Sequence, residues 1–134
     1  MALKITAADM VAQARSRIEE ISAEDLIPQL DDPDLVIVDI RDVRERQRVG
    51  WIPGSFHAPR GMLEFWVDPE SPYFKPIFGE PKRFVLHCAS GWRSALSTAT
   101  LNDMGFEAAH LKDGFSDWRA KSGPIDTEIR DKDS

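Results

Sequence analysis

The chain has 134 residues, of which 42% are hydrophobic and 30% are charged, and its formal net charge at pH 7 is -6. This length suits one compact domain, and the composition is that of a globular protein rather than a disordered or fibrous one. The negative charge argues against a nucleic-acid partner, and the lack of an apolar stretch of roughly 18 residues or of a signal-peptide-like start favours a cytoplasmic protein with no membrane partner.

The first part of the chain alternates between helix and strand patterns. Residues 1–20 are predicted to form a helical arm, because Thr6 is a suitable N-cap and apolar residues recur after it at helical spacing. A second helix is expected from Ser22 to Leu30, where an Asp-Asp-Pro run stops it. The sequence LVIVDI at 35–40 is an apolar, β-branched run that is typical of a strand buried on both faces.

The rest of the chain continues this alternation. The expected elements are a polar helix at 42–49, a turn-rich crossing at 50–60, a helical turn at 61–67, an irregular excursion at 68–82, a strand at 83–87, a helix at 94–104, a strand at 106–111 and a helix at 116–121. Strands that alternate with helices predict an α/β fold with a mainly parallel central sheet flanked by helices on both faces. In such sheets, ligands bind at the carboxyl ends of the strands.

The segment HCASGWRS, His87–Ser94, has the residues of a reactive site. Cys88, the single cysteine of the chain, follows a predicted strand directly and precedes a predicted helix. The small residues after it are Ala89, Ser90 and Gly91. They allow successive backbone N–H groups to curl around an anion, to which the positive end of the helix dipole adds. Arg93 supplies a cation, and this setting favours the thiolate form of Cys88.

A buried structural thiol is the simplest alternative for Cys88, because free cysteine is among the most buried residue types. The combination of strand end, small-residue loop, arginine and helix start favours a reactive thiol, because a core cysteine requires none of these. A metal site is not expected, since His87 and Cys88 point to opposite faces of a strand and no second cysteine exists. The three histidines, His57, His87 and His110, are expected to be structural.

Five segments of the chain, between about residues 22 and 124, resemble the rhodanese superfamily in the same order. They are VDIRDVRE, GWIPGS, CASGWRS, MGF and LKDGFSDWRAKSGP. Three positions depart from the family pattern: Trp51 replaces a histidine, Ser55 an alanine, and Asp113 the first glycine of a closing pair. None of these departures lies in the Cys88 loop, so the family's chemistry is still expected.

The resemblance implies a rhodanese-like domain at 21–126, between the helical arm at 1–20 and a polar C-terminal tail at 127–134. It also implies a sulfurtransferase in which Cys88 takes sulfane sulfur from thiosulfate or a persulfide donor, holds it as a persulfide, and passes it to cyanide or a thiol acceptor. A sulfur-accepting protein is a further expected partner. No cofactor and no metal are implied.

The resemblance also assigns the residues that bind the donor. They are Arg93, Ala89, Ser90, Gly91, Trp92, Ser94 and, from a segment near the rim of the site, Arg60. Trp92 is expected to be exposed, because so tight a loop has little room for an indole. An ordinary surface arginine is the alternative for Arg60. Asp39 and Glu45 have an alternative role, which is to pair with Arg41 or a loop arginine and hold the loop. Charges that follow a strand are usually solvated or capping, however, and this is the role expected for them.

Two other functions are open from the sequence. Phosphatases related to this fold have a Cys-x5-Arg loop that holds a tetrahedral phosphate, whereas here four residues separate Cys88 from Arg93. The shorter loop suits a single protruding sulfur better than a phosphoryl group. The other alternative is a non-catalytic rhodanese-like module for binding or regulation, which is usual where the cysteine is absent. The presence of Cys88 favours an enzyme.

Overall fold

The computed structural model describes residues 2–127, which contain five strands and six α-helices. The strands are β1 (Glu19–Ile21), β2 (Leu35–Asp39), β3 (Phe56–His57), β4 (Arg83–His87) and β5 (Ala109–Leu111). The helices are α1 (Ala7–Arg15), α2 (Ala23–Leu26), α3 (Val43–Val49), α4 (Leu63–Val67), α5 (Trp92–Asp103) and α6 (Gly114–Ala120). Short 3-10 helices lie at Ile27–Gln29, Arg60–Met62 and Pro76–Gly79. Within the described residues, no helix has the length and apolar character needed to cross a bilayer.

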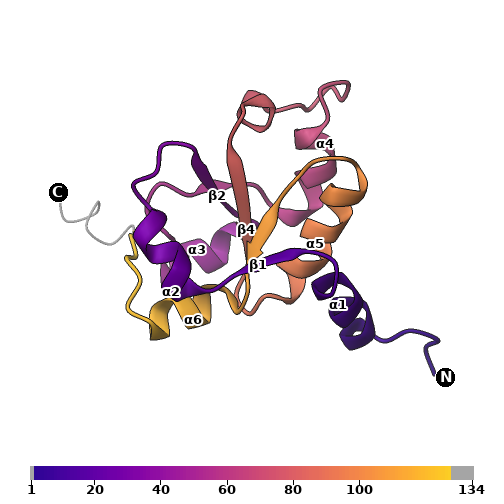
Figure 1. The fold of residues 1–134 in the computed structure, drawn as a ribbon, viewed down its shortest axis with the longest axis horizontal. Helices are drawn as coiled ribbons and strands as arrows, with labels where there is room; N and C mark the ends of the chain where they lie inside the picture. Colours follow the sequence, from indigo (N-terminus) through magenta and orange to yellow (C-terminus); the bar gives the residue numbers. More distant parts are fainter. Residues whose placement is uncertain (1, 128–134) are drawn as a thin grey trace.

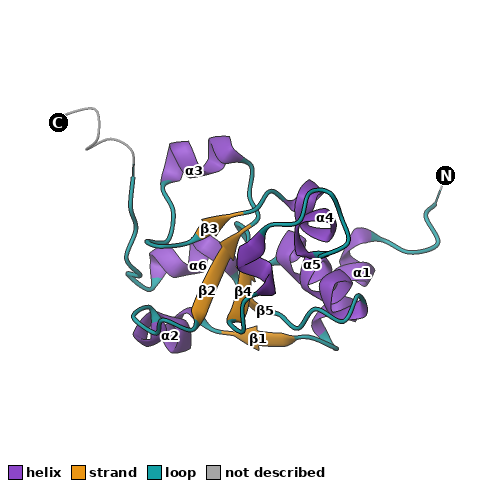
Figure 2. Ribbon diagram, turned by 90° about the horizontal axis from the view of Figure 1, so that it is seen from above, coloured by secondary structure: helices purple, strands orange, loops and turns teal. Residues whose placement is uncertain are grey.

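The strands form one sheet in the order β1-β5-β4-β2-β3, and every neighbouring pair is parallel. Helices α1, α4 and α5 lie on one side of the sheet, and α2 and α6 lie on the other (Figures 1 and 2). The expected α/β fold, with a parallel sheet covered on both faces, is therefore confirmed.

Strand β4 runs through the middle of this sheet. Its residues Phe84 and Leu86 pack into the core beneath α4 and α5, whereas Val85 packs into the core beneath α2 and α6. Because successive side chains of a strand point to opposite faces, a strand that is covered on both faces needs an apolar run rather than an alternating pattern. The central place of β4 puts the residue that follows it, Cys88, at the middle of the carboxyl edge.

The N-terminal segment differs from the expected single helix over residues 1–20. The helix begins after Thr6, whose side chain accepts a hydrogen bond from the Asp9 N–H as predicted for an N-cap, but it ends at Arg15. Strand β1 follows and pairs with the free edge of β5, so it lies across the expected boundary between arm and domain. The local sequence pattern does not predict this strand, because β1 forms by pairing with β5, which is distant in the sequence.

Several other boundaries also moved. Helix α5 begins at Trp92 rather than residue 94, and α6 begins at Gly114 rather than residue 116, so both helices start closer to the loops before them. Strand β5 spans only Ala109–Leu111, half of the expected 106–111. The predicted tail at 127–134 lies outside the described residues except for its first residue.

A buried ion-pair cluster closes the carboxyl end of β2. Asp39 accepts hydrogen bonds from Arg41 Nε at 2.9 Å and Arg41 Nη2 at 2.8 Å, and it also binds Arg46 Nη1 at 2.8 Å. Asp39 and Arg41 are fully buried, which corrects the expectation that these charges are solvated. Burial opposes ionisation of Asp39, but the Arg41 hydrogen bonds hold its pKa well below the usual range.

Asp39→Asn is expected to lower the free energy of unfolding by about 3–5 kcal/mol, because it leaves Arg41 buried without a counter-charge. The pKa of Asp39 is depressed in the folded protein. The loss is therefore fully present above the unfolded aspartate pKa of about 3.9 and shrinks as the pH falls below it. Urea unfolding at neutral and acidic pH measures this difference. Asp103→Asn, which removes the exposed partner of Arg17, is the control and should change stability little; equal losses in both variants would contradict the prediction.

Candidate active site

Cys88 lies between the end of β4 and the start of α5, and its side chain is fully buried. Its Sγ accepts hydrogen bonds from the backbone N–H groups of Gly91, at 3.1 Å, and Ser94, at 3.3 Å. The Ser94 hydroxyl lies 3.5 Å from the same sulfur. Two amides and the N-terminal end of a twelve-residue helix thus face one sulfur atom, and this arrangement stabilises a negative charge on it.

Close approach of the turn between β5 and α6 shapes this loop. Gly91 has φ +97°, and a Cβ there would collide with the carbonyl oxygen of Lys112. Gly114 has φ +73°, and a Cβ there would collide with the backbone of Ala89. The first N–H groups of α6 also bind the loop, from Phe115 to the Cys88 carbonyl at 2.8 Å and from Ser116 to the Ala89 carbonyl at 3.0 Å. The carbonyl groups of the loop therefore point to α6, whereas two N–H groups of the loop point to the sulfur.

Arg93 joins the loop to α3. Its Nη1 and Nη2 donate to the two carboxylate oxygens of Glu45 at 2.8 and 2.9 Å. Glu45 also accepts a hydrogen bond from the Asp42 N–H, which caps α3. The Arg93 hydrogen bonds, acting against burial, lower the pKa of Glu45. Glu45 thus holds a loop arginine, whereas a solvated or capping role was expected for it.

Ser94 connects Cys88 to groups that were not expected in the site. Its Oγ lies 2.8 Å from His110 Nδ1, and His110 Nε2 lies 2.9 Å from Glu20 Oε2. Arg15 Nε donates to the same Glu20 oxygen at 2.8 Å. His110 is on β5, Glu20 on β1 and Arg15 on α1, so no sequence spacing links them to the loop. The pairing of β1 with β5 puts Glu20 directly beside His110.

The other two histidines have contacts that fit the structural role expected of them. His57 Nε2 lies 2.7 Å from the Arg41 carbonyl oxygen at the end of β2. His87 is fully buried, and its Nδ1 lies 3.3 Å from the Cys88 carbonyl oxygen. Burial lowers the pKa of His87 to about 4, so its ring is neutral at physiological pH.

The remaining predicted site residues fall into two groups. Ser90 and Trp92 are on the outer side of the loop, and Trp92 is 48% exposed, which confirms the expected exposure of the indole. Arg60 is exposed and lines a hollow beside Leu96 and Thr100 of α5. The residues that line this hollow do not include the Cys88 loop. The structure thus directs the N–H groups of Gly91 and Ser94 at the sulfur, and it leaves Arg60 on the flank of α5.

Comparison with known proteins identifies the family of this chain. Residues 22–121 match the sequence model of the family described as "Rhodanese-like domain". The chain belongs to this family. In Mus musculus, the "Thiosulfate sulfurtransferase/rhodanese-like domain-containing protein 3" is 27% identical over 104 residues, which cover 73% of this chain and 66% of the mouse protein.

Two solved structures resemble the chain over most of its length. The protein RPA3614 of Rhodopseudomonas palustris CGA009, described as of unknown function and a possible tyrosine phosphatase, is 50% identical with a TM-score of 0.90, covering 94% of this chain and 98% of that one. A thiosulfate sulfurtransferase of Pseudomonas aeruginosa is 25% identical with a TM-score of 0.74. It matches 90% of this chain, which spans 22% of that longer protein.

The structure explains two departures from the rhodanese pattern. Asp113, which replaces the first glycine of the closing pair, has φ -113°, a conformation open to any residue. The second glycine of the pair, Gly114, is the one with positive φ that touches the Cys88 loop. Trp51 stacks under the Arg46 guanidinium, with 5.2 Å between the guanidinium carbon and the ring centroid. Neither departure removes a contact to the sulfur.

Gly91→Ala is expected to be more damaging than Gly105→Ala, although both glycines have a similar positive φ. A Cβ at Gly105 meets nothing within 4 Å, so that variant should lose only the roughly 1–2 kcal/mol of a strained backbone. A Cβ at Gly91 must displace the Lys112 carbonyl and with it the loop around Cys88. Thermal unfolding and the rate of Cys88 alkylation measure the difference. Equal effects of the two substitutions on both readouts would show that the close approach is unimportant.

Proposed function

We propose that this protein is a sulfurtransferase that carries sulfane sulfur on Cys88, with thiosulfate or a persulfide as donor and cyanide or a thiol as acceptor. The observation that carries the proposal is the environment of Sγ, which faces two backbone N–H groups and a hydroxyl at the start of α5. Such an environment favours a thiolate nucleophile. Membership of the rhodanese-like family and the likeness to a thiosulfate sulfurtransferase support the same reaction.

The proposed reaction has two transfers. The Cys88 thiolate attacks the outer sulfur of thiosulfate, a sulfur–sulfur bond forms, and sulfite leaves with the electron pair of the bond that breaks. The same fixed N–H groups that face Sγ then lie beside the persulfide and stabilise its negative charge. Cyanide or a thiolate attacks the outer sulfur, which restores the Cys88 thiolate and completes the cycle without a cofactor.

Arg93 has two roles in this proposal. Its paired hydrogen bonds to Glu45 fix the second half of the loop against α3, and its positive charge lies beside the site that binds the anionic donor. A guanidinium offers a planar set of donors that matches a carboxylate, whereas lysine offers a point charge. The position of the loop thus depends on an arginine and not on a positive charge alone.

A phosphatase is the second candidate, because the RPA3614 protein is described as a possible tyrosine phosphatase. The loop spacing argues against it here. Only four residues lie between Cys88 and Arg93, and the described contacts direct two loop amides at the sulfur. A phosphoryl group presents three oxygens that each need donors, whereas a terminal sulfur is a single smaller acceptor. A non-catalytic binding module, the third candidate, gives no reason for these contacts to Sγ.

The wild-type protein is expected to gain one sulfur on Cys88 after treatment with thiosulfate, as seen by mass spectrometry, and to lose it to cyanide as thiocyanate. Cys88→Ser should gain none and make no thiocyanate, because a hydroxyl is a far weaker nucleophile. Circular dichroism controls for folding of the variant. Hydrolysis of an aryl phosphate, assayed in parallel, should stay at background. Phosphate release through Cys88 without any sulfur loading would assign the protein to the phosphatases instead.

Arg93→Lys is expected to lower kcat/KM for thiosulfate roughly 10- to 100-fold, the kinetic equivalent of the ~1.5–3 kcal/mol of a hydrogen bond to a charged group. The charge is kept, but the paired contact with Glu45 is lost. Arg44→Lys is the matched control on α3, since Arg44 pairs with the exposed Asp42 and not, among the described residues, with the Cys88 loop. Unchanged kinetics in a folded Arg93→Lys protein would contradict this role of Arg93.

A further inference from the structure

A continuous line of hydrogen-bonding groups runs from Cys88 to the surface. From Sγ it passes to the Ser94 hydroxyl, to His110 and to Glu20, with separations of 3.5, 2.8 and 2.9 Å. Ser94 and His110 are fully buried, whereas the Glu20 side chain is 22% exposed. A buried line of this kind costs free energy unless each member is satisfied. Its members come from α5, β5 and β1.

The chemistry of its two ends sets the direction of the hydrogen bonds. An ionised carboxylate only accepts, so Glu20 requires a proton on His110 Nε2. Neutral His110 then has a bare Nδ1, which accepts the Ser94 O–H, and the Ser94 oxygen in turn accepts the thiol proton of Cys88. Every hydrogen bond of the line therefore points from the sulfur toward Glu20.

We propose that His110 accepts the proton of the Cys88 thiol through the Ser94 hydroxyl, with Glu20 holding the ring in place and balancing its charge. The Sγ–H bond breaks as Ser94 takes that proton and passes its own to His110 Nδ1, which leaves a thiolate and an imidazolium. No electrons are transferred and no other reactant is needed. His110 and Glu20 are positioning residues that act through Ser94, and the inference rests on the proposed function of Cys88 and deepens it.

The charges around His110 fit this assignment. Glu20 and Asp113 are the negative groups that face it, and Arg15 is the positive one. Burial lowers the pKa of His110, and the hydrogen bond that His110 donates to Glu20 acts against that change. Burial likewise opposes the ionisation of Glu20, but the hydrogen bonds of His110 and Arg15 prevail and lower its pKa. The ring thus starts neutral, next to a carboxylate that stabilises the charge it gains.

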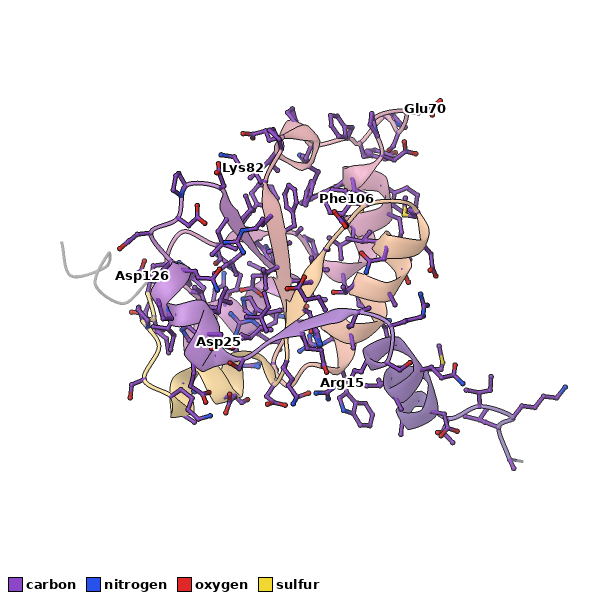
Figure 3. The ribbon with its side chains drawn as sticks, viewed as in Figure 1. Arg15, Asp25, Glu70, Lys82, Phe106 and Asp126 are labelled. Atoms are coloured by element: carbon purple, nitrogen blue, oxygen red, sulfur yellow. The ribbon has the colours of Figure 1, made fainter. Side chains whose placement is uncertain are left out.

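The N-terminal segment supplies Glu20, the surface end of this line, and Arg15, which binds Glu20. Arg15 and Glu20 both precede residues 22–121, which match the family. Helix α1 packs on α5 through Val11 and Ala14. In Figure 3, Arg15 lies at the opposite end of the sheet from Lys82 and Phe106, where β4 and β5 begin. The segment therefore brings its charged residues to the carboxyl edge of the sheet, where the sulfur is.

The test is the rate at which iodoacetamide alkylates Cys88 in the full chain, measured from about pH 5 to 9. His110→Asn keeps a polar group near Ser94 but takes no proton, so its rate at neutral pH should fall on the order of 10²-fold. Glu20→Gln keeps an acceptor for Nε2 and loses the charge, so its rate should fall in the same direction. Both variants should approach the wild-type rate at high pH, where hydroxide in the solvent removes the proton of the Cys88 thiol.

His57→Asn is the matched control, because it makes the same change in a histidine that contacts the Arg41 carbonyl rather than the line to the sulfur. Its alkylation profile should coincide with that of the wild type. Profiles of His110→Asn and Glu20→Gln that also coincide with the wild type, or that are lowered by one factor at every pH, would overturn the proposal. If His110→Asn does not fold, the partly exposed Glu20→Gln decides.

Alkylation needs no sulfur donor, so this test is independent of the reaction proposed above. A protein that never gains sulfur from thiosulfate, but whose profile shifts in both variants, would contradict the sulfurtransferase and support the proton line. If the wild type gains sulfur normally but the alkylation profile is unchanged in both variants, the sulfurtransferase would be supported and the proton line contradicted.

Discussion

In the loop that holds Cys88, the backbone carbonyl groups and the backbone N–H groups have different partners, and the structure of the site depends on this division. The carbonyl groups of Cys88 and Ala89 accept hydrogen bonds from the first N–H groups of α6, whereas the N–H groups of Gly91 and Ser94 face the sulfur. This division requires the turn before α6 to lie directly against the loop, which is possible only because Gly91 and Gly114 lack a Cβ. The environment of the Cys88 sulfur is thus a consequence of two backbones in close contact.

Charged side chains secure the same loop from the other side. The charged residues at and after the end of β2 differ in their burial. Asp39 and Arg41 are buried together, whereas Glu45 is partly exposed and pairs with Arg93. The buried pair fixes the end of β2, and the partly exposed pair ties α3 to the start of α5. A buried pair is costly to break, so the Asp39–Arg41 pair at the end of β2 contributes more to the stability of this frame than the partly exposed Arg93–Glu45 pair.

The N-terminal segment belongs to the architecture of the site and is more than an added helix. Strand β1 completes the edge of the sheet next to β5, and this pairing places Glu20 beside His110. The ring of His110 in turn contacts Ser94, one of the two residues whose amides face the sulfur. Glu20 on β1 is thus connected to the Cys88 sulfur through two side chains, those of His110 and Ser94.

The sequence by itself determined the parallel α/β fold, the place of Cys88 at a strand end and the glycine of its loop, because apolar runs, turn residues and motif order are local signals. It did not determine strand β1, the burial of Arg41, the partner of Arg93, or the line from Ser94 through His110 to Glu20. These depend on which segments meet at the carboxyl edge of the sheet. A charge has the same appearance in the sequence whether it is solvated or buried, and only the tertiary structure supplies the partner that decides between the two.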